Sequence, residues 1–169
     1  IPSPTGEDLN GLVHSGGLYV AVGSNGAVLT STDGSTWNIR NTNSVQVLND
    51  IASSGTMFVA VGGGGTVLVS ANGIDWDTAA SVPTSAVLND VVWTGTQYVA
   101  VGVGGVVITS SDGQNWVRRI SGVTVALEHV VSAGTSLFAV GAGGAILEST
   151  TGLTWTKRVS GTAKALEGI

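Results

Sequence analysis

The sequence contains no cysteine, only 3 prolines in 169 residues, and charged side chains at only 10% of its positions. Without cysteine the chain has no disulfide, no thiolate metal site and no cysteine nucleophile, so burial and hydrogen bonding must stabilise it. No apolar run approaches the roughly 18 residues of a membrane-spanning helix. The net charge of -5 disfavours nucleic acid and anionic membranes as partners, because both attract proteins through basic patches.

Apolar residues and glycine are plentiful. Hydrophobic residues make up 43% of the chain, enough to bury a core of single-domain size, and 26 residues are glycine. Val, Ile and Leu recur between the glycines, so the composition predicts a globular chain in which glycine marks the turns of a regular structure.

The regular structure is a repeat. Tryptophans recur at intervals of 39, 40 and 39 residues, at Trp37, Trp76, Trp116 and Trp155. A fixed period of this length is typical of solenoids and propellers. After an N-terminal extension over residues 1–8, the repeats span about 9–47, 48–87, 88–126 and 127–165, and ALEGI (165–169) resembles the first strand of a further repeat.

Each repeat predicts four strands separated by Gly and Asx clusters. In the first repeat they cover about 9–15, 18–23, 27–31 and 37–41, and the second strand, which reads YVAVG or FVAVG in three repeats, predicts burial on both faces. Between the second and third strands, runs such as Gly23-Ser-Asn-Gly26 predict tight turns with two central residues at positive φ. These runs are not phosphate-binding loops, because no helix follows them.

The turn before each tryptophan reads STDGSTW, SANGIDW, SSDGQNW or STTGLTW. It resembles the Asp-box, or BNR, repeat family, and the resemblance extends over all four repeats. It implies an all-β β-propeller of four-stranded antiparallel blades and a structural turn in which the acid accepts backbone N–H bonds and the tryptophan is buried between blades. The structural residues are Asp33, Asn72, Asp112, Thr151 and the four tryptophans. The box is one residue shorter than the family form, and Asn72 and Thr151 replace the acid.

Some Asp-box proteins are sialidases, whose chemistry needs three convergent arginines with a Tyr and Glu pair. Here Arg40, Arg119 and Arg158 each follow a box tryptophan by three residues, which predicts outer strands rather than a common centre. The two histidines occupy different repeat positions without recurrent carboxylates, so we expect no metal site. We therefore expect that the protein is not an enzyme and has no cofactor and no catalytic residue. A sialidase-like hydrolase is the distant third of the functions considered.

A polar set follows the recurrent leucine of the first strand, which the family places innermost. We expect these residues to rim the central channel and either to bond one another or to bind a ligand. Trp93 stands at a position where the other repeats have polar residues. Its ring is expected either to pack within the blade or to be exposed as a platform on which a sugar stacks. The candidate ligand-binding residues are Trp93, Asn89, Asp90, His14, Asn49 and Asp50.

The sequence therefore predicts a non-enzymatic recognition module that binds glycan or protein at the cell surface. The alternative is an architectural repeat domain or assembly factor with protein partners. Low lysine content with abundant Gly, Ser, Thr and Val favours an extracellular location. Three arrangements stay open: a closed four-bladed ring, an eight-bladed ring built by a homodimer, and part of a longer repeat array.

Overall fold

The computed structural model describes residues 4–169, which form four antiparallel sheets of four strands each, with the strands of every sheet in chain order. We call each sheet a blade. Blade 1 contains β1 (Leu9–Ser15), β2 (Leu18–Gly23), β3 (Val28–Ser31) and β4 (Asn38–Arg40). Blade 2 contains β5 (Leu48–Ser53), β6 (Phe58–Gly62), β7 (Val67–Ser70) and β8 (Asp77–Thr78). Blade 3 contains β9 (Leu88–Trp93), β10 (Tyr98–Gly102), β11 (Val106–Ser110) and β12 (Val117–Arg119). Blade 4 contains β13 (Leu127–Ala133), β14 (Ser136–Gly141), β15 (Ala145–Ser149) and β16 (Thr156–Arg158).

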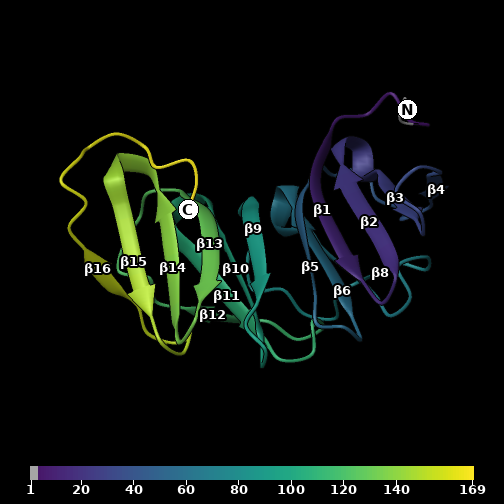
Figure 1. Ribbon diagram of the computed structural model, residues 1–169. Coiled ribbons are helices and arrows are strands. Elements are labelled where there is room, and N and C mark those ends of the chain that lie inside the picture. Colours follow the sequence, from purple (N-terminus) through teal and green to yellow (C-terminus); the bar gives the residue numbers. More distant parts are fainter. Residues whose placement is uncertain (1–3) are drawn as a thin grey trace.

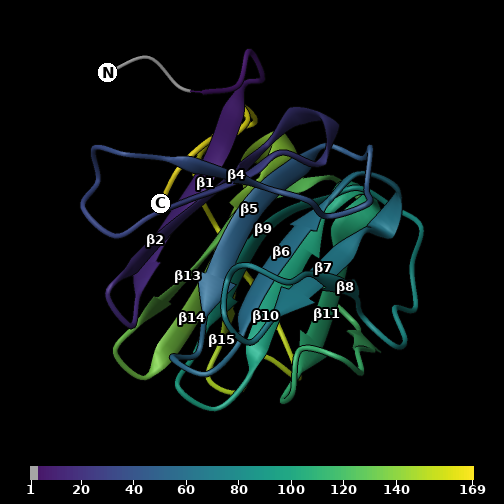
Figure 2. The same ribbon diagram turned by 90° about the vertical axis from the view of Figure 1, so that its right-hand side faces the viewer.

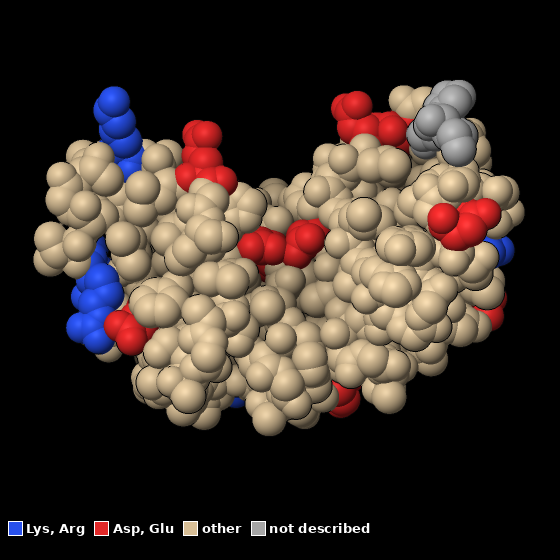
Figure 3. All heavy atoms as spheres, viewed as in Figure 1, with Lys and Arg blue, Asp and Glu red and all other residues tan. Residues whose placement is uncertain are grey.

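The blades form an open arc. The first strands lie in the order β1, β5, β9, β13, each next to the first strand of the following blade, so blades 1 and 4 stand at opposite ends (Figure 1). Figure 2 looks along the arc, with the sheets one behind another. The space-filling view shows a deep hollow between the two end blades (Figure 3). Within residues 4–169 the four blades do not meet as a closed ring, because β1 and β13 lie at opposite ends of the arc and are not neighbours.

Each blade has two apolar faces. Its rear face packs against the front face of the next blade: Val20 and Val22 of blade 1 share a core cluster with Ile51 and Trp76 of blade 2. Two further clusters join blades 2 and 3 and blades 3 and 4 in the same way. The middle strands β6 and β10 are buried along their whole length, as the sequence predicts. Stability therefore comes mainly from contacts between neighbouring blades.

The front face of blade 1 has no blade against it. Leu12 is 60% exposed, whereas the residues at the same repeat position, Ile51, Val91 and Val130, are 4 to 5% exposed. Among the tryptophans, Trp76 and Trp116 are buried, and Trp37 on this open face is only partly buried. Trp155 is also only partly buried, although it packs against the core between blades 3 and 4. The expected burial of all four tryptophans is thus confirmed for the two inner blades.

The turns between second and third strands are wider than the sequence predicts. They contain three residues in a short 3-10 segment, as in η1 (Ser24–Gly26), and the last two residues have positive φ. A Cβ atom on Gly26 would lie 2.1 Å from the carbonyl oxygen of Ser44, in the segment that leads to the next blade. Close approach of this segment, rather than a ligand, explains the recurring glycine.

The segment 165–169 is not a strand, contrary to expectation. The N–H group of Leu166 donates to the carbonyl of Gly141, but no second strand of a further blade is present for it to pair with. The outer strand of blade 1 is also shorter than predicted, because Trp37 belongs to the turn and not to β4. No helix in residues 4–169 has the length and apolar character needed to cross a bilayer.

Candidate functional site

The turn before each tryptophan is held by its own side chains. Asp33 Oδ1 accepts the N–H groups of Ser35 and Thr36 at 2.8 and 2.7 Å, and Ser31 Oγ accepts the N–H group of Gly34 at 2.9 Å. The bonds from Thr36 and Ser35 lower the pKa of Asp33 to about 2, since they stabilise the carboxylate. The indole of Trp37 donates to the Gly34 carbonyl. These bonds give the turn a structural role.

Asn72 and Thr151, which replace the aspartate in two of the turns, behave differently. Asn72 Oδ1 accepts the same pair of N–H groups, from Ile74 and Asp75, both at 2.9 Å. The Thr151 hydroxyl accepts one such bond, from the Leu153 N–H group at 3.2 Å. Asparagine therefore replaces aspartate fully in this turn, whereas threonine replaces it only in part, as its shorter side chain requires.

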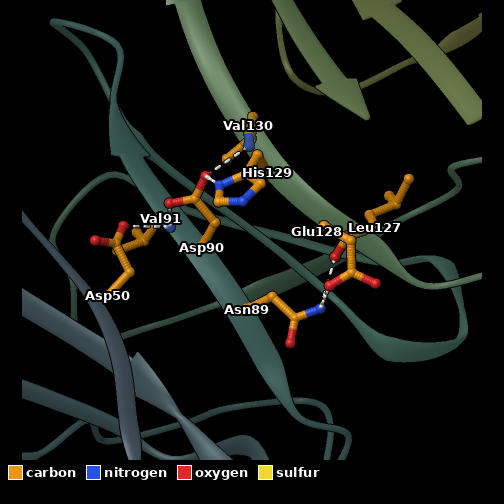
Figure 4. Close-up of polar contacts among 8 residues, drawn as sticks. All are labelled: Asp50, Asn89, Asp90, Val91, Leu127, Glu128, His129 and Val130. Atoms are coloured by element: carbon orange, nitrogen blue, oxygen red, sulfur yellow. Dashed lines mark hydrogen bonds and ion pairs between the residues drawn. The ribbon is translucent and has the colours of Figure 1, made fainter. Parts of the chain in front are cut away.

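The predicted inner polar residues lie on the first strands and connect neighbouring blades. Asn49 Nδ2 donates to the carbonyl of Leu88 at 2.7 Å. Asn89 Nδ2 donates to the carbonyl of Leu127 at 2.8 Å, as Figure 4 shows. In blade 1, Asn10 makes the equivalent bond to Leu48. Each of these amides donates to a main-chain carbonyl of the next blade. This structural role is enough to explain why asparagine recurs at the position, without a ligand.

The neighbouring carboxylates make a second row of such bonds. Asp50 Oδ2 accepts the N–H group of Val91 at 3.0 Å, and Asp90 Oδ2 accepts that of Val130 at 2.7 Å (Figure 4). His129 Nδ1 lies 3.4 Å from Asp90 Oδ2. In Figure 3, carboxylates are visible in the floor of the hollow. Among the described residues, no group of three or more His, Asp or Glu side chains could hold a metal ion.

At the junction of blades 2 and 3, the carboxylates of Asp50 and Asp90 both accept the N–H group of Val91, Asp50 through Oδ2 at 3.0 Å and Asp90 through Oδ1 at 2.9 Å. Burial raises the pKa of Asp50 to about 8, and the neighbouring carboxyl group of Asp90 acts in the same direction. Near neutral pH Asp50 is therefore mostly protonated. Folding keeps that proton, whereas in the unfolded chain Asp50 releases it near pH 4.

The raised pKa of Asp50 predicts that the stability of the fold depends on pH. The folded pKa of Asp50 exceeds its unfolded value, so the free energy of unfolding should fall as pH rises from about 4 to about 8. In Asp50→Asn the amide replaces the protonated carboxyl, so the variant should match the wild type at about pH 4 and below. Near pH 9 it should be more stable by roughly 1 to 2 kcal/mol, since water reaches one side of the pair.

Urea unfolding across this pH range measures the effect. Asp77→Asn, which changes an exposed carboxylate on β8, is the control and should leave the pH profile unaltered. Equal pH profiles for Asp50→Asn and the wild type would contradict the raised pKa of Asp50.

Trp93 and His14 do not join the inner polar residues. Trp93 lies at the end of β9, about 13 Å from Asn89 and about 10 Å from Asp90 along a strand that rises roughly 3.3 Å per residue. Its ring packs on Tyr98 at 4.6 Å between centroids and against the core between blades 2 and 3, leaving it half-buried. His14 stacks on Tyr19 at the equivalent place in blade 1. The structure therefore splits the six candidate residues between two ends of the blades.

The arginines lie on outer strands, as predicted. Arg40 and Arg119 donate through Nε to the hydroxyls of Thr30 and Thr109, at 2.8 and 2.9 Å, and Arg158 donates to Glu148 at 2.7 Å. Each bond stays within its own blade. In the described part of the chain these guanidinium groups do not converge, so the sialidase constellation is not assembled.

Two surface hollows were not predicted from the sequence. One, of about 520 Å³, lies on blade 3 between the turn at Gly104 and Gly105 and the segment Arg118–Thr124. The other, of about 530 Å³, lies on blade 4 at the same repeat position, between Gly143 and Gly144 and the segment Lys157–Thr162. The signal in the sequence is the pair of similar runs RRISG and KRVSG, which have no counterpart in the first two repeats.

Comparisons with known proteins indicate the fold. No family model matches the chain, and no curated protein matches it. Among solved structures, the chain is similar to YCF48 from Cyanidioschyzon merolae, with a TM-score of 0.71 and 21% identity over 92% of this chain and 57% of that chain. It is also similar to the structure of YCF48 bound to D1 peptide, with a TM-score of 0.78 and 18% identity over 99% of this chain and 60% of that chain.

A third similar structure contains the WD40 repeats of RRP9, with a TM-score of 0.73 and 10% identity over 92% of this chain and 52% of that chain. WD40 repeats form propeller blades. The fold is a β-propeller. This propeller chain spans between half and three fifths of the length of these neighbours, and at these identities the likeness concerns the fold alone.

Proposed function

We propose that this propeller chain is a non-enzymatic module that binds a protein partner, as the architectural or assembly-factor alternative expects. One observation carries the proposal: the inner polar residues are engaged in bonds between blades, whereas blades 3 and 4 expose apolar and cationic residues in open hollows. Open, shallow surfaces with exposed aliphatic side chains are suited to protein contacts. One similar structure, that of YCF48, contains a bound peptide according to its description.

The proposal favours protein over glycan and over catalysis. A stacking platform needs an accessible aromatic face, and Trp93 uses much of its ring in packing against Tyr98 and the blade interface. Glycoside hydrolysis needs two carboxyl groups facing a substrate, but Asp50 and Asp90 accept main-chain bonds from the next blade. We also propose that the repeats are of the Asp-box type, on the strength of the turn bonds, and that the protein acts outside the cell.

Binding of the purified chain to a printed peptide library and to a glycan array tests this function. We expect reproducible peptide ligands, no glycan ligands and no turnover of a fluorogenic sialoside. Glycan binding without any peptide binding would overturn the proposal in favour of a glycan-recognition module. Sialoside turnover that survives repurification would overturn the non-enzymatic part.

A further inference from the structure

Blades 3 and 4 carry residues on their outer strands that the fold does not need. The sequence Arg118-Arg119-Ile120 of blade 3 aligns with Lys157-Arg158-Val159 of blade 4. The same positions hold Ile39-Arg40-Asn41 in blade 1 and Thr78-Ala79-Ala80 in blade 2. Blades 1 and 2 fold without a basic pair followed by an aliphatic residue, so this pattern is a property of the surface of blades 3 and 4.

In the hollow of blade 3 the positive charge is free to bind a partner. Arg119 uses Nε to bond the Thr109 hydroxyl, a neutral group, and this bond orients the rest of the guanidinium. Arg118 is exposed, and its guanidinium group has no hydrogen bond or ion pair with any described residue. Two cations therefore lie beside one hollow with no carboxylate paired to either.

The same hollow exposes an apolar side chain. Ile120 follows the two arginines and is 86% exposed. Gly122, in the same segment, has a φ of +77° and open space where a Cβ atom would lie. Arg118 and Arg119 extend to opposite faces of β12, but β12 is the edge strand of blade 3 and both arginines line the hollow. A partner segment that runs along this edge can therefore reach both cations and Ile120.

Blade 4 repeats the arrangement with less free charge. Lys157 is exposed and has no partner among the described residues, whereas Arg158 is paired with Glu148 at 2.7 Å. Val159 is 97% exposed, and Gly161 has a φ of +73° with open space beside it. Figure 3 shows Lys and Arg gathered at the outer edge of this end of the molecule, over β16. The two hollows lie on adjacent blades and present similar chemistry.

We propose that these two hollows together bind an acidic segment of a protein partner, with carboxylates on Arg118, Arg119 and Lys157 and aliphatic side chains on Ile120 and Val159. This inference rests on the proposed protein-binding function and names its site and the chemistry of its ligand. Arginine binds carboxylates through paired N–H donors, which gives the contact directional specificity. The exposed side chains of Ile120 and Val159 favour a peptide over a nucleic acid, because a phosphate backbone offers no aliphatic side chain to cover them.

The probe is a fluorescein-labelled peptide with two Glu-Leu-Glu blocks joined by Gly-Ser spacers of increasing length, and its binding is followed by fluorescence anisotropy. We expect the peptide with one particular spacer length to bind best. Its Gln-for-Glu version should bind at least about tenfold more weakly, because it loses several surface ion pairs that act together. Raising the salt from about 0.05 M to about 0.5 M should weaken binding in the same range.

Variants locate the site. Arg118→Ala with Lys157→Ala should weaken binding about tenfold, and Ile120→Ser with Val159→Ser should weaken it several-fold. Arg40→Ala is the matched control: Arg40 bonds Thr30 as Arg119 bonds Thr109, but it lies in blade 1, so its removal should leave binding unchanged. Melting temperatures of all variants should stay close to that of the wild type, because none of the replaced groups is buried.

Three results would overturn the inference. Equal binding of the Glu and Gln peptides would show that charge does not select the ligand. Equal weakening by Arg40→Ala and by the blade 3 and 4 variants would place the site elsewhere. Tight binding of heparin or of phosphatidylserine vesicles, lost with the same variants and without peptide binding, would assign the hollows to a polyanion or a membrane. In the first two cases, the protein-binding function would still be supported if the peptide library yields ligands. If the library yields no ligand either, the protein-binding function is also wrong.

Discussion

Trp116→Ala should lower the free energy of unfolding by roughly 3 to 5 kcal/mol, the usual cost of removing a large buried aromatic side chain. Trp116 is 4% exposed and lies in the core between blades 2 and 3. Its indole donates to the Gly113 carbonyl at 2.8 Å, and its ring lies 6.3 Å from that of Tyr98. The sheets on both sides fix the size of the cavity left behind, so the site cannot collapse. Urea unfolding followed by far-UV circular dichroism measures the loss.

Trp37→Ala is the matched control for Trp116→Ala. Trp37 occupies the same repeat position and makes the same indole bond to a glycine carbonyl, at 3.3 Å, but no blade covers it. We expect a loss of about 1 kcal/mol, since its ring is already partly in water. Equal losses for the two variants would mean that blade 1 is covered in solution, and the open front face would then be wrong.

Gly105→Ala should destabilise the chain by roughly 3 kcal/mol, through two effects. Gly105 has a φ of +69°, which an L side chain adopts only with strain, and its Cβ atom would lie 2.1 Å from the carbonyl oxygen of Val123. The segment that leads from blade 3 to blade 4 would have to move away from the turn. A thermal melt or a urea titration gives the magnitude.

The neighbouring Gly104 separates the two effects. Its φ is +73°, but no atom lies within 4 Å of where a Cβ atom would be. Gly104→Ala should therefore cost only the backbone strain, about 1 kcal/mol. If Gly104→Ala and Gly105→Ala cost the same, the close approach of the connecting segment does not contribute to stability.

The repeat made most of the fold predictable. The first two strands of blade 1 have the bounds that the sequence predicts, because apolar runs between Gly and Asx clusters define a strand locally. Strand ends next to the tryptophan turn were less accurate, because a tryptophan favours a strand by composition, whereas the indole of Trp37 bonds the Gly34 carbonyl within the turn. Whether four blades close a ring depends on the rotation between neighbouring blades, and no local pattern encodes that rotation.

The candidate site was predicted only in part. Asn49, Asp50, Asn89 and Asp90 lie together on the inner strands, as their common repeat position indicates. Their grouping with Trp93 was wrong in geometry, because residues a few positions apart on one strand lie at opposite ends of the blade. The two cationic hollows were missed, although the runs RRISG and KRVSG stand in the sequence, since an aliphatic residue reads as core until its exposure is known.

The open front face of blade 1 has a consequence for how the chain unfolds. In a repeat protein each blade is stabilised by its own contacts and by those with its neighbours, so a blade at the end of the arc has one supporting interface and an inner blade has two. The inner blades should thus form the most protected cooperative unit, whereas the end blades open more often without global unfolding. Because blades 3 and 4 carry the two cationic hollows, a ligand that bridges them would resist the opening of blade 4 and leave blade 1 the least protected part of the molecule.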